Sequence, residues 1–328
     1  MSLFWFDRLQ YSETLKKLII FEFFETDITN INRITKATWN SKLAKEILDK
    51  FTYEKHCLIR SLMRSNDSIY YYLIFYSNNE LHKKIVIEYK DKHTRHIHEY
   101  GGFEDLQSWF LKINNIDGDS HSKPLGKVKT STEYAKNLVY NYWKSNINTN
   151  DDQGLEFTKR LLTYKDSKEN LTEATTKGFD FDFFIFFEEN NSLINIEFAL
   201  NYKNTKENYV CTPMKYCWGY GPPGVPDNKM KYNRLWKATK LLNGEFSILN
   251  YSENNNDIGF SIINDLDYDR GFLNETKYII SKNNFEKSIF ETANEDCLSF
   301  KHFDENSKQI KQYDKDFFDK WKINRNKY

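Results

Sequence analysis

Acidic residues alternate with apolar ones in two short runs near the middle of the chain. In "FDFDFFIFF" Asp180 and Asp182 occupy every second position, and in "LINIEFAL" Glu197 follows Asn195 at the same interval. Because successive strand residues point to opposite faces, each run places its polar residues on one face of a strand. Burying neighbouring carboxylates is costly unless another charge compensates them. A divalent cation supplies that charge, so the pattern predicts an oxygen-ligand site suited to Mg²⁺.

A hairpin and a set of flanking elements must hold these acids together. The intervening "EENNS" contains turn-forming residues, so the two runs predict neighbouring antiparallel strands. Helical patterns precede them in "STEYAKNLVYNYWKS" and "GLEFTKRLLTYK", and a third helix follows in "KMKYNRLWKATKLLNG", with Gly244 as its expected stop. Strand patterns come next in "EFSILNYS" and "IGFSIIND". The predicted order is helix, β-meander, helix and strand.

This arrangement resembles a known family of nucleases. Asp182, the hairpin and then Glu197-Phe198-Ala199 are similar to the PD-(D/E)XK motif, in which an acid precedes a second acid that is followed by any residue and a lysine. The element order around the motif resembles the restriction-endonuclease-like core, over roughly residues 133–265. The resemblance implies an α/β (α+β) fold class, with a mixed β-sheet flanked by helices.

The resemblance also implies an activity and a set of site residues. Asp182 and Glu197 would be catalytic metal ligands, the main-chain carbonyl of Phe198 a third ligand, and Asp180 an auxiliary one. The cofactor would be Mg²⁺, with Mn²⁺ as a substitute, and it would lower the pKa of an attacking water. The implied protein is an endonuclease that hydrolyses phosphodiester bonds of nucleic acid, DNA in preference to RNA, in restriction-modification or antiviral defence.

Position 199 departs from the family pattern, because it holds Ala where the motif has a lysine that orients water and offsets developing charge. Three interpretations remain open. The favoured one is an engineered Lys-to-Ala substitution, since Ala is a poor strand former. In the second, the lysine has migrated to Lys203 or Lys215. In the third, the chain is a degenerate nuclease-fold module that binds nucleic acid or a protein partner without cleavage.

Two further interpretations of the acids compete with a metal site. The acids could cap a strand or lie on a solvated sheet face, as alternating acids often do. Paired carboxylates also serve glycosidases, although both acids here fall within one hairpin, where a cation is needed more than an acid and a base. The predicted order of elements favours the nuclease.

Basic residues beyond the hairpin could contact phosphates. Lys231 and Arg234 lie on the helix that follows the motif, and Lys215 lies in the Pro- and Gly-rich loop before it. These three residues are the predicted nucleic-acid contacts. An ordinary solvated basic helix face is the alternative.

The first part of the chain predicts a separate domain without evident chemistry. Residues 114–132 are rich in Gly, Asp, Ser and Pro and read as a linker. We therefore expect an α+β recognition or assembly domain over 1–118 and the nuclease domain over 119–328. In the first domain, residues 41–50 and "GGFEDLQSWFLKI" (101–113, with Gly breakers) predict helices, and "SIYYYLIFYSNNELHKKIVIEYK" predicts two strands joined by an Asn78-Asn79 turn. In "HTRHIHEY" His93, His96 and His98 suggest zinc, but no acid or cysteine completes the set, and an exposed polar strand is the expectation. No internal period is visible, so a repeat architecture is not expected.

The composition of the chain limits its possible compartment and partners. Lys and Arg together number 47, as do Asp and Glu, so only a local basic surface could attract nucleic acid. Four scattered cysteines, and the lack of a long apolar run or a leader pattern, predict a reduced, cytoplasmic protein without a membrane partner. Cleavage of both strands of a duplex would require a homodimer or a partner defence protein.

Overall fold

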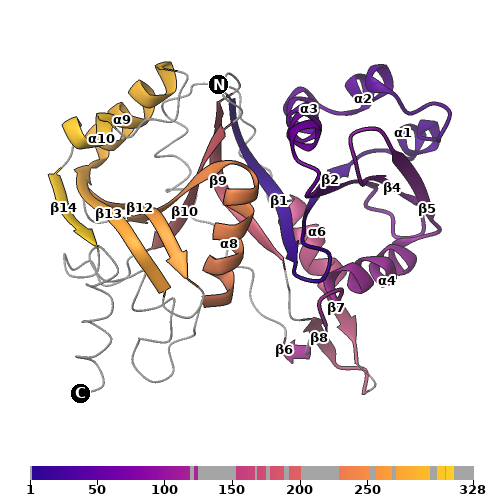
Figure 1. Cartoon of the computed structure of the whole chain (residues 1–328). Helices are drawn as coiled ribbons and strands as arrows, with labels where there is room; N and C mark the ends of the chain where they lie inside the picture. Colours follow the sequence, from indigo (N-terminus) through magenta and orange to yellow (C-terminus); the bar gives the residue numbers. More distant parts are fainter. Residues whose placement is uncertain are drawn as a thin grey trace. The chain divides into compact units, whose positions relative to one another are not determined.

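The structure is a computed structural model of a mixed α/β protein (Figure 1). It describes residues 2–118, 122–124, 153–166, 168–174, 178–187, 192–200, 229–251, 256–267, 271–295, 301–306 and 308–313. The chain forms two compact units. The amino unit comprises Phe6–Thr130 and Asn146–Asp180, and the carboxyl unit comprises Met1–Trp5, Ser131–Ser145 and Phe181–Tyr328. The expected domain division after residue 118 stays a prediction, and these units have other bounds.

Five strands in the order β1-β2-β3-β4-β5 form the main sheet of the amino unit. Only β2 and β3 run parallel, and the other neighbours are antiparallel. The strands are β1 (Ser2–Ser12), β2 (Lys17–Glu25), β3 (Ile69–Tyr76), β4 (Lys84–Tyr89) and β5 (Arg95–Tyr100). A small antiparallel sheet has the order β6-β8-β7, from β6 (Ser122–Pro124), β7 (Thr163–Lys165) and β8 (Leu171–Ala174). The predicted strand pair around Asn78-Asn79 and the strand through His96 and His98 are confirmed.

Helices cover both faces of this sheet, α1 to α3 on one side and α4 and α6 on the other (Figure 1). They are α1 (Ile28–Arg33), α2 (Ser41–Ile47), α3 (Lys50–Ser65), α4 (Phe103–Asn114) and α6 (Gln153–Leu162). Asp27, Asn40 and Asp49 each accept a backbone N–H as the N-cap of one of the first three helices. The predicted helices at 41–50 and 101–113 are therefore confirmed, although the first of them ends at Ile47 and α3 follows directly.

Aromatic side chains fill the core between the sheet and its second helix layer. Phe21 and Phe23 of β2 contact Phe110 of α4, and Phe23 also contacts Phe157 of α6. The α6 helix was predicted to precede the meander of a nuclease core, but it packs within the amino unit. The other predicted helix before the meander, "STEYAKNLVYNYWKS", lies outside the described residues.

The carboxyl unit has the strand order β9-β10-β11-β12-β13-β14. Only β10 and β11 run parallel, and α8 connects them. The strands are β9 (Phe179–Phe187), β10 (Ser192–Leu200), β11 (Gly244–Tyr251), β12 (Asp257–Asp267), β13 (Gly271–Ser281) and β14 (Lys308–Tyr313). The helices are α8 (Lys229–Leu241), α9 (Lys282–Asn294) and α10 (Lys301–Asn306). The predicted hairpin, the helix after it and the two strands that follow are confirmed.

The end of α8 differs from the expectation in one detail. Asn243 has the positive φ of 55° that was expected of a glycine stop, and Gly244 begins β11 instead. A Cβ at Gly244 would lie 2.5 Å from Cδ1 of Leu193 on β10. The glycine therefore permits close packing against the neighbouring strand.

The two units repeat one strand arrangement. In each, an antiparallel hairpin is followed by helix, a strand parallel to the second hairpin strand, and two antiparallel strands. Glu22 of β2 pairs with Leu73 of β3, and Glu197 of β10 pairs with Ile248 of β11, so both pairs are 51 residues apart. A repeat architecture was not expected, because the sequence shows no internal period. A topological repeat is present without a visible sequence period.

Candidate functional site

The β9–β10 hairpin carries the predicted acids, and its backbone fixes their alignment. Ile194 pairs with Ile185, and Ile196 pairs with Phe183. Continued by one residue, this register aligns Asp182 with Glu197. On this extended register, the two predicted metal ligands would occupy opposite positions on adjacent strands.

The side chains of the predicted ligands lie outside the described part of the structure. Asp180 and Asp182 are placed as strand positions in β9, and Glu197, Phe198 and Ala199 as strand positions in β10. Lys203 and Lys215, the proposed positions of a migrated lysine, lie outside the described residues altogether. For the five residues of β9 and β10 the structure therefore gives a position along a strand, and it gives no position for the two lysines.

The neighbouring strand β11 places a buried amide beside position 199. Ala199 pairs with Asn250 across the parallel ladder. Asn250 is fully buried, and within the described structure neither its Nδ2 nor its Oδ1 has a hydrogen-bond partner. Leaving a buried polar group unpaired costs about 1–3 kcal/mol. Sequence analysis did not single out Asn250, and only its position in the mostly apolar run "FSILNY" could have indicated it.

The predicted phosphate contacts on α8 have different exposures. Lys231 is exposed and Arg234 is half-buried, while Leu235 and Ala238 of the same helix are buried. Tyr232 of α8 packs edge-on against Phe246 of β11. The helix is therefore anchored by its apolar side, and Lys231 lies on its exposed part.

A second pair of opposed acids lies in the β1–β2 hairpin of the amino unit. Asp7 Oδ2 accepts the backbone N–H of Phe23 at 2.7 Å, and Glu22 Oε1 accepts the backbone N–H of Asp7 at 3.3 Å. Lys55 of α3 places its Nζ 3.5 Å from Asp7 Oδ1 and forms an ion pair with Glu22. The side chains of all three residues are only 2% exposed. An ammonium group thus compensates the two buried carboxylates.

This Asp7–Glu22–Lys55 cluster matches the predicted motif in spacing and in residue types. Glu22 follows Asp7 by 15 residues, the same interval that separates Asp182 from Glu197. Its burial and its bonds to strand backbone indicate a structural role for the cluster. Sequence analysis missed the cluster, although Glu22 inside the apolar run "LIIFEFF" was the available signal.

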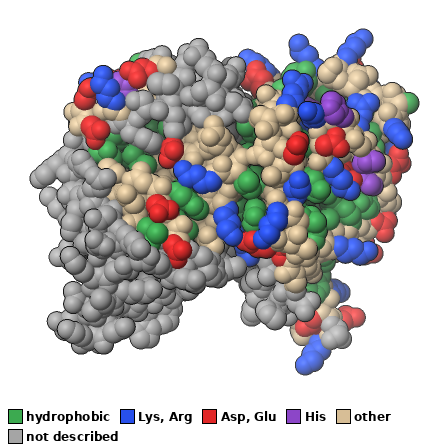
Figure 2. Space-filling view, viewed as in Figure 1, with side chains coloured by type: hydrophobic (Ala, Val, Ile, Leu, Met, Phe, Trp, Pro, Cys, Tyr) green, Lys and Arg blue, Asp and Glu red, His purple; other side chains and the backbone are tan. Residues whose placement is uncertain are grey.

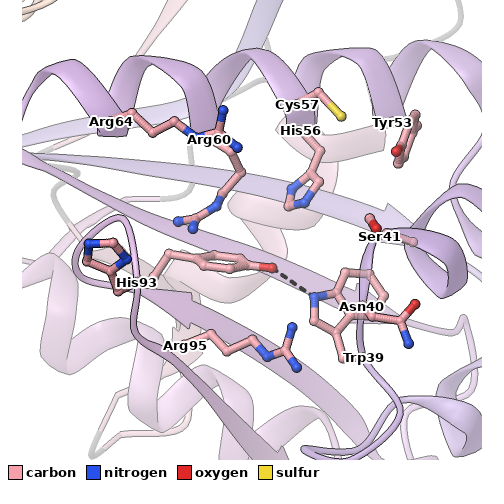
Figure 3. Close-up of a pocket in the computed structure, with 12 residues that line it drawn as sticks. Trp39, Asn40, Ser41, Tyr53, His56, Cys57, Arg60, Arg64, His93 and Arg95 are labelled. Carbon is pink, nitrogen blue, oxygen red and sulfur yellow. Dashed lines mark hydrogen bonds between the residues drawn. The ribbon is translucent and has the colours of Figure 1, made fainter.

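A pocket of about 390 Å³ opens between α3 and the β4–β5 hairpin of the same unit (Figure 3). Its lining is rich in cationic and aromatic side chains: Trp39, Asn40, Ser41, Ala44, Tyr53, His56, Cys57, Arg60, Arg64, Tyr89, His93 and Arg95. The indole Nε1 of Trp39 donates a 2.8 Å hydrogen bond to the hydroxyl of Tyr89 at the base of the pocket. Lys, Arg and His side chains also lie at the surface of this unit in Figure 2.

Burial controls the ionisation of His56 in the wall of this pocket. Desolvation, with a smaller contribution from the Arg60 charge, lowers the pKa of His56 from 6.5 to about 4. His56 is therefore neutral at pH 7, and its Nδ1 lies 3.2 Å from the Tyr71 hydroxyl. The cationic character of the pocket comes from its arginines.

The histidines considered for zinc lie on β5 and in the loop before it. His96 and His98 are exposed on β5, which confirms the expected polar strand, and His98 Nε2 contacts Glu88 Oε2 at 3.1 Å. Within the part of the chain that is described, no three His, Cys, Asp or Glu residues are grouped so as to hold a metal ion. Helices there are also too short or too polar to cross a membrane.

Comparison with protein-family models, with curated proteins and with solved structures gave no match.

Proposed function

We propose that the chain is a Mg²⁺-dependent endonuclease of the PD-(D/E)XK type that acts on DNA. The observation that carries the proposal is the β9–β10 register, which aligns Asp182 with Glu197 when it is continued by one residue. In addition, α8 leads from β10 into the parallel strand β11, an order expected of a restriction-endonuclease-like core. A restriction or anti-phage role in the cytoplasm is part of the same proposal.

The residues present fit a hard divalent cation. Directly opposed positions of an antiparallel pair are close enough for their side chains to interact. The β1–β2 hairpin shows that such a pair in this strand arrangement needs a positive charge, since Lys55 supplies one there. Asp182 and Glu197 would hold Mg²⁺ or Mn²⁺, with the Phe198 carbonyl and Asp180 as further oxygen donors. The bound ion would supply an activated water at neutral pH.

The chain's own residues would bind and orient the substrate. Lys231 and Arg234 of α8, with Lys215, would contact phosphates and carry no base specificity. A lysine at position 199 would orient the attacking water, and Ala199 cannot do so. The chain as given is therefore expected to bind DNA and metal but to cleave slowly.

Cleavage assays test this proposal. Plasmid DNA, single-stranded DNA and RNA would be incubated with the chain as given, with Ala199→Lys, and with Ala199→Lys combined with Asp182→Asn, each in Mg²⁺ and in EDTA. We expect Mg²⁺-dependent cutting of DNA by Ala199→Lys and its loss in the combined variant. Cutting by the unaltered chain at a rate similar to that of Ala199→Lys would indicate a migrated lysine. Equal cutting with and without Asp182 would contradict the assigned site.

A non-catalytic module is the second candidate, and Ala199 is the observation that favours it. Such a module would keep the fold and bind nucleic acid or a protein partner without hydrolysis. DNA binding that persists while neither the chain nor Ala199→Lys cuts any substrate would support this candidate over the nuclease.

A further inference from the structure

The pocket of the amino unit concentrates positive charge. Arg60 and Arg64 come from α3, Arg95 begins β5, and His93 lies in the loop before it. Figure 3 shows the guanidinium groups of Arg60 and Arg95 directed into the space between these elements, with His93 at one side. The described lining contains no Asp or Glu side chain. Like charges gathered in one concave site favour an anionic ligand.

Arg60 is held in place by the protein itself. Its two terminal nitrogens donate to the backbone carbonyls of Asp91 and Lys92 at 3.2 and 2.8 Å. Its guanidinium also lies 4.1 Å from the centre of the Tyr89 ring, which is stacked on Tyr71 at 5.5 Å. Burial, together with the nearby charge of Arg64, lowers the pKa of Arg60. One fixed guanidinium thus forms the inner wall of the pocket.

The other two arginines remain available. Among the residues that the structure describes, the side chains of Arg64 and Arg95 form no hydrogen bond and no ion pair. The nearest acid of the loop, Asp91, is outside the lining, and its carboxylate accepts the backbone N–H groups of His93 and Thr94. Two guanidinium groups therefore face the pocket with their donors unused.

We propose that this pocket binds a phosphate group, carried either by nucleic acid or by a free nucleotide. Arginine is suited to this ligand, because its planar donors match two phosphate oxygens at once. Arg64 and Arg95 would donate to the phosphate, and Arg60 would stabilise its charge from the inner wall. This inference does not rest on the proposed nuclease function, since binding here needs neither metal nor cleavage.

Fluorescence anisotropy in EDTA tests the inference with the full chain. The probes are a 3′-labelled single-stranded oligonucleotide with a 5′-phosphate and the same oligonucleotide with a 5′-hydroxyl. We expect binding that weakens about tenfold in Arg95→Gln and further in Arg64→Gln/Arg95→Gln, consistent with the loss of charge-assisted contacts. Arg33→Gln is the matched control, because Arg33 is an exposed arginine of the same unit that pairs with Glu46 instead. It should leave affinity within about twofold.

Competition identifies the source of the phosphate. Displacement of the probe by AMP or inorganic phosphate, with a preference for the 5′-phosphate, would support a terminal or free phosphate group. Equal binding of both oligonucleotides, weakened by the double variant and resistant to AMP, would support a backbone phosphate. Binding that is unchanged in a double variant with an unaltered thermal melt, or no binding of any probe at low salt, would overturn the inference.

Discussion

Each unit contains a β-hairpin with an Asp on its first strand and a Glu on its second, but the two hairpins differ in what lies near these acids to compensate their charge. In the amino unit, Lys55 reaches in from α3 and neutralises Asp7 and Glu22 in a site that is closed to solvent. In the carboxyl unit, the β9–β10 register continued by one residue would align Asp182 with Glu197, and the motif position for a lysine holds Ala199. The comparison indicates that the same β-hairpin arrangement can hold a structural ion cluster in one unit and, as we propose, a cation site in the other. What differs is the source of the compensating charge.

Removal of Lys55 should have the largest effect. Lys55→Met would leave two carboxylates buried without compensation, so we expect a loss of about 3–5 kcal/mol in the free energy of unfolding. Urea denaturation measures this loss. Adding Asp7→Asn and Glu22→Gln to Lys55→Met should recover most of it, because no net charge is then buried. A Lys55→Met protein as stable as the parent would show that the cluster is not compensated as described.

Protonation of His56 should have the next largest effect on stability. The unfolded chain binds a proton at His56 near pH 6.5, whereas the folded chain does so only near pH 4. The neutral folded form is therefore fully favoured above pH 6.5, and stability falls as the pH drops from 6.5 to 4, by about 3 kcal/mol. Comparing urea denaturation of the parent and His56→Gln over this range isolates the contribution. Parallel pH profiles would contradict solvent exclusion around α3.

Mg²⁺ bound at the β9–β10 hairpin should raise the free energy of unfolding by less than the His56 effect. With a dissociation constant of about 1 mM, 10 mM Mg²⁺ would add about 1.4 kcal/mol. Thermal melts in Mg²⁺ and in EDTA would detect a rise of a few degrees. Asp182→Asn should remove the rise, while a Lys55→Met/Asp7→Asn/Glu22→Gln protein should keep it. If Mg²⁺ raised the melting temperature of Asp182→Asn by the same amount, the ion would bind at another site.

Lys231 should contribute least, because it is exposed and would be only one of several phosphate contacts. Lys231→Gln is expected to weaken duplex DNA binding several-fold and to reduce the salt slope of log K by about 0.9. Anisotropy titrations at several salt concentrations measure both quantities. Lys287→Gln on α9, which removes an exposed lysine paired with Glu291, is the control. An equal effect of both substitutions would indicate non-specific loss of charge.

Local patterns were enough to predict much of the fold. Alternation in the two aromatic runs predicted β9 and β10, and apolar spacing with Gly breakers predicted α4 and α8. The sequence could not predict that α6 belongs to the amino unit. Its position there depends on contacts of Phe157 with Phe23 and Tyr76, which are distant in sequence. Non-local packing of this kind leaves no signature in a single sequence.

The candidate sites divide in the same way. The β9–β10 hairpin with Asp182 and Glu197 could be predicted, because the alternation of polar and apolar residues along a strand is apparent within a few residues. The Asp7–Glu22–Lys55 cluster was missed because Lys55 sits on an amphipathic helix, where a lysine is normally solvated. The pocket lined by arginines was missed because its Arg and His residues come from α3, β5 and the loop between β4 and β5. These segments meet only in the folded chain.

Binding of Mn²⁺ tests the central claim most directly, because it does not depend on the residue at position 199. An electron paramagnetic resonance titration in EDTA-free buffer would count bound Mn²⁺ in the chain as given, in Asp182→Asn and in Glu197→Gln. The account predicts one bound ion per chain and its loss in both variants, with far-UV circular dichroism unchanged. Equal Mn²⁺ binding by all three proteins, or none by the parent at millimolar Mn²⁺, would contradict a cation site in the β9–β10 hairpin.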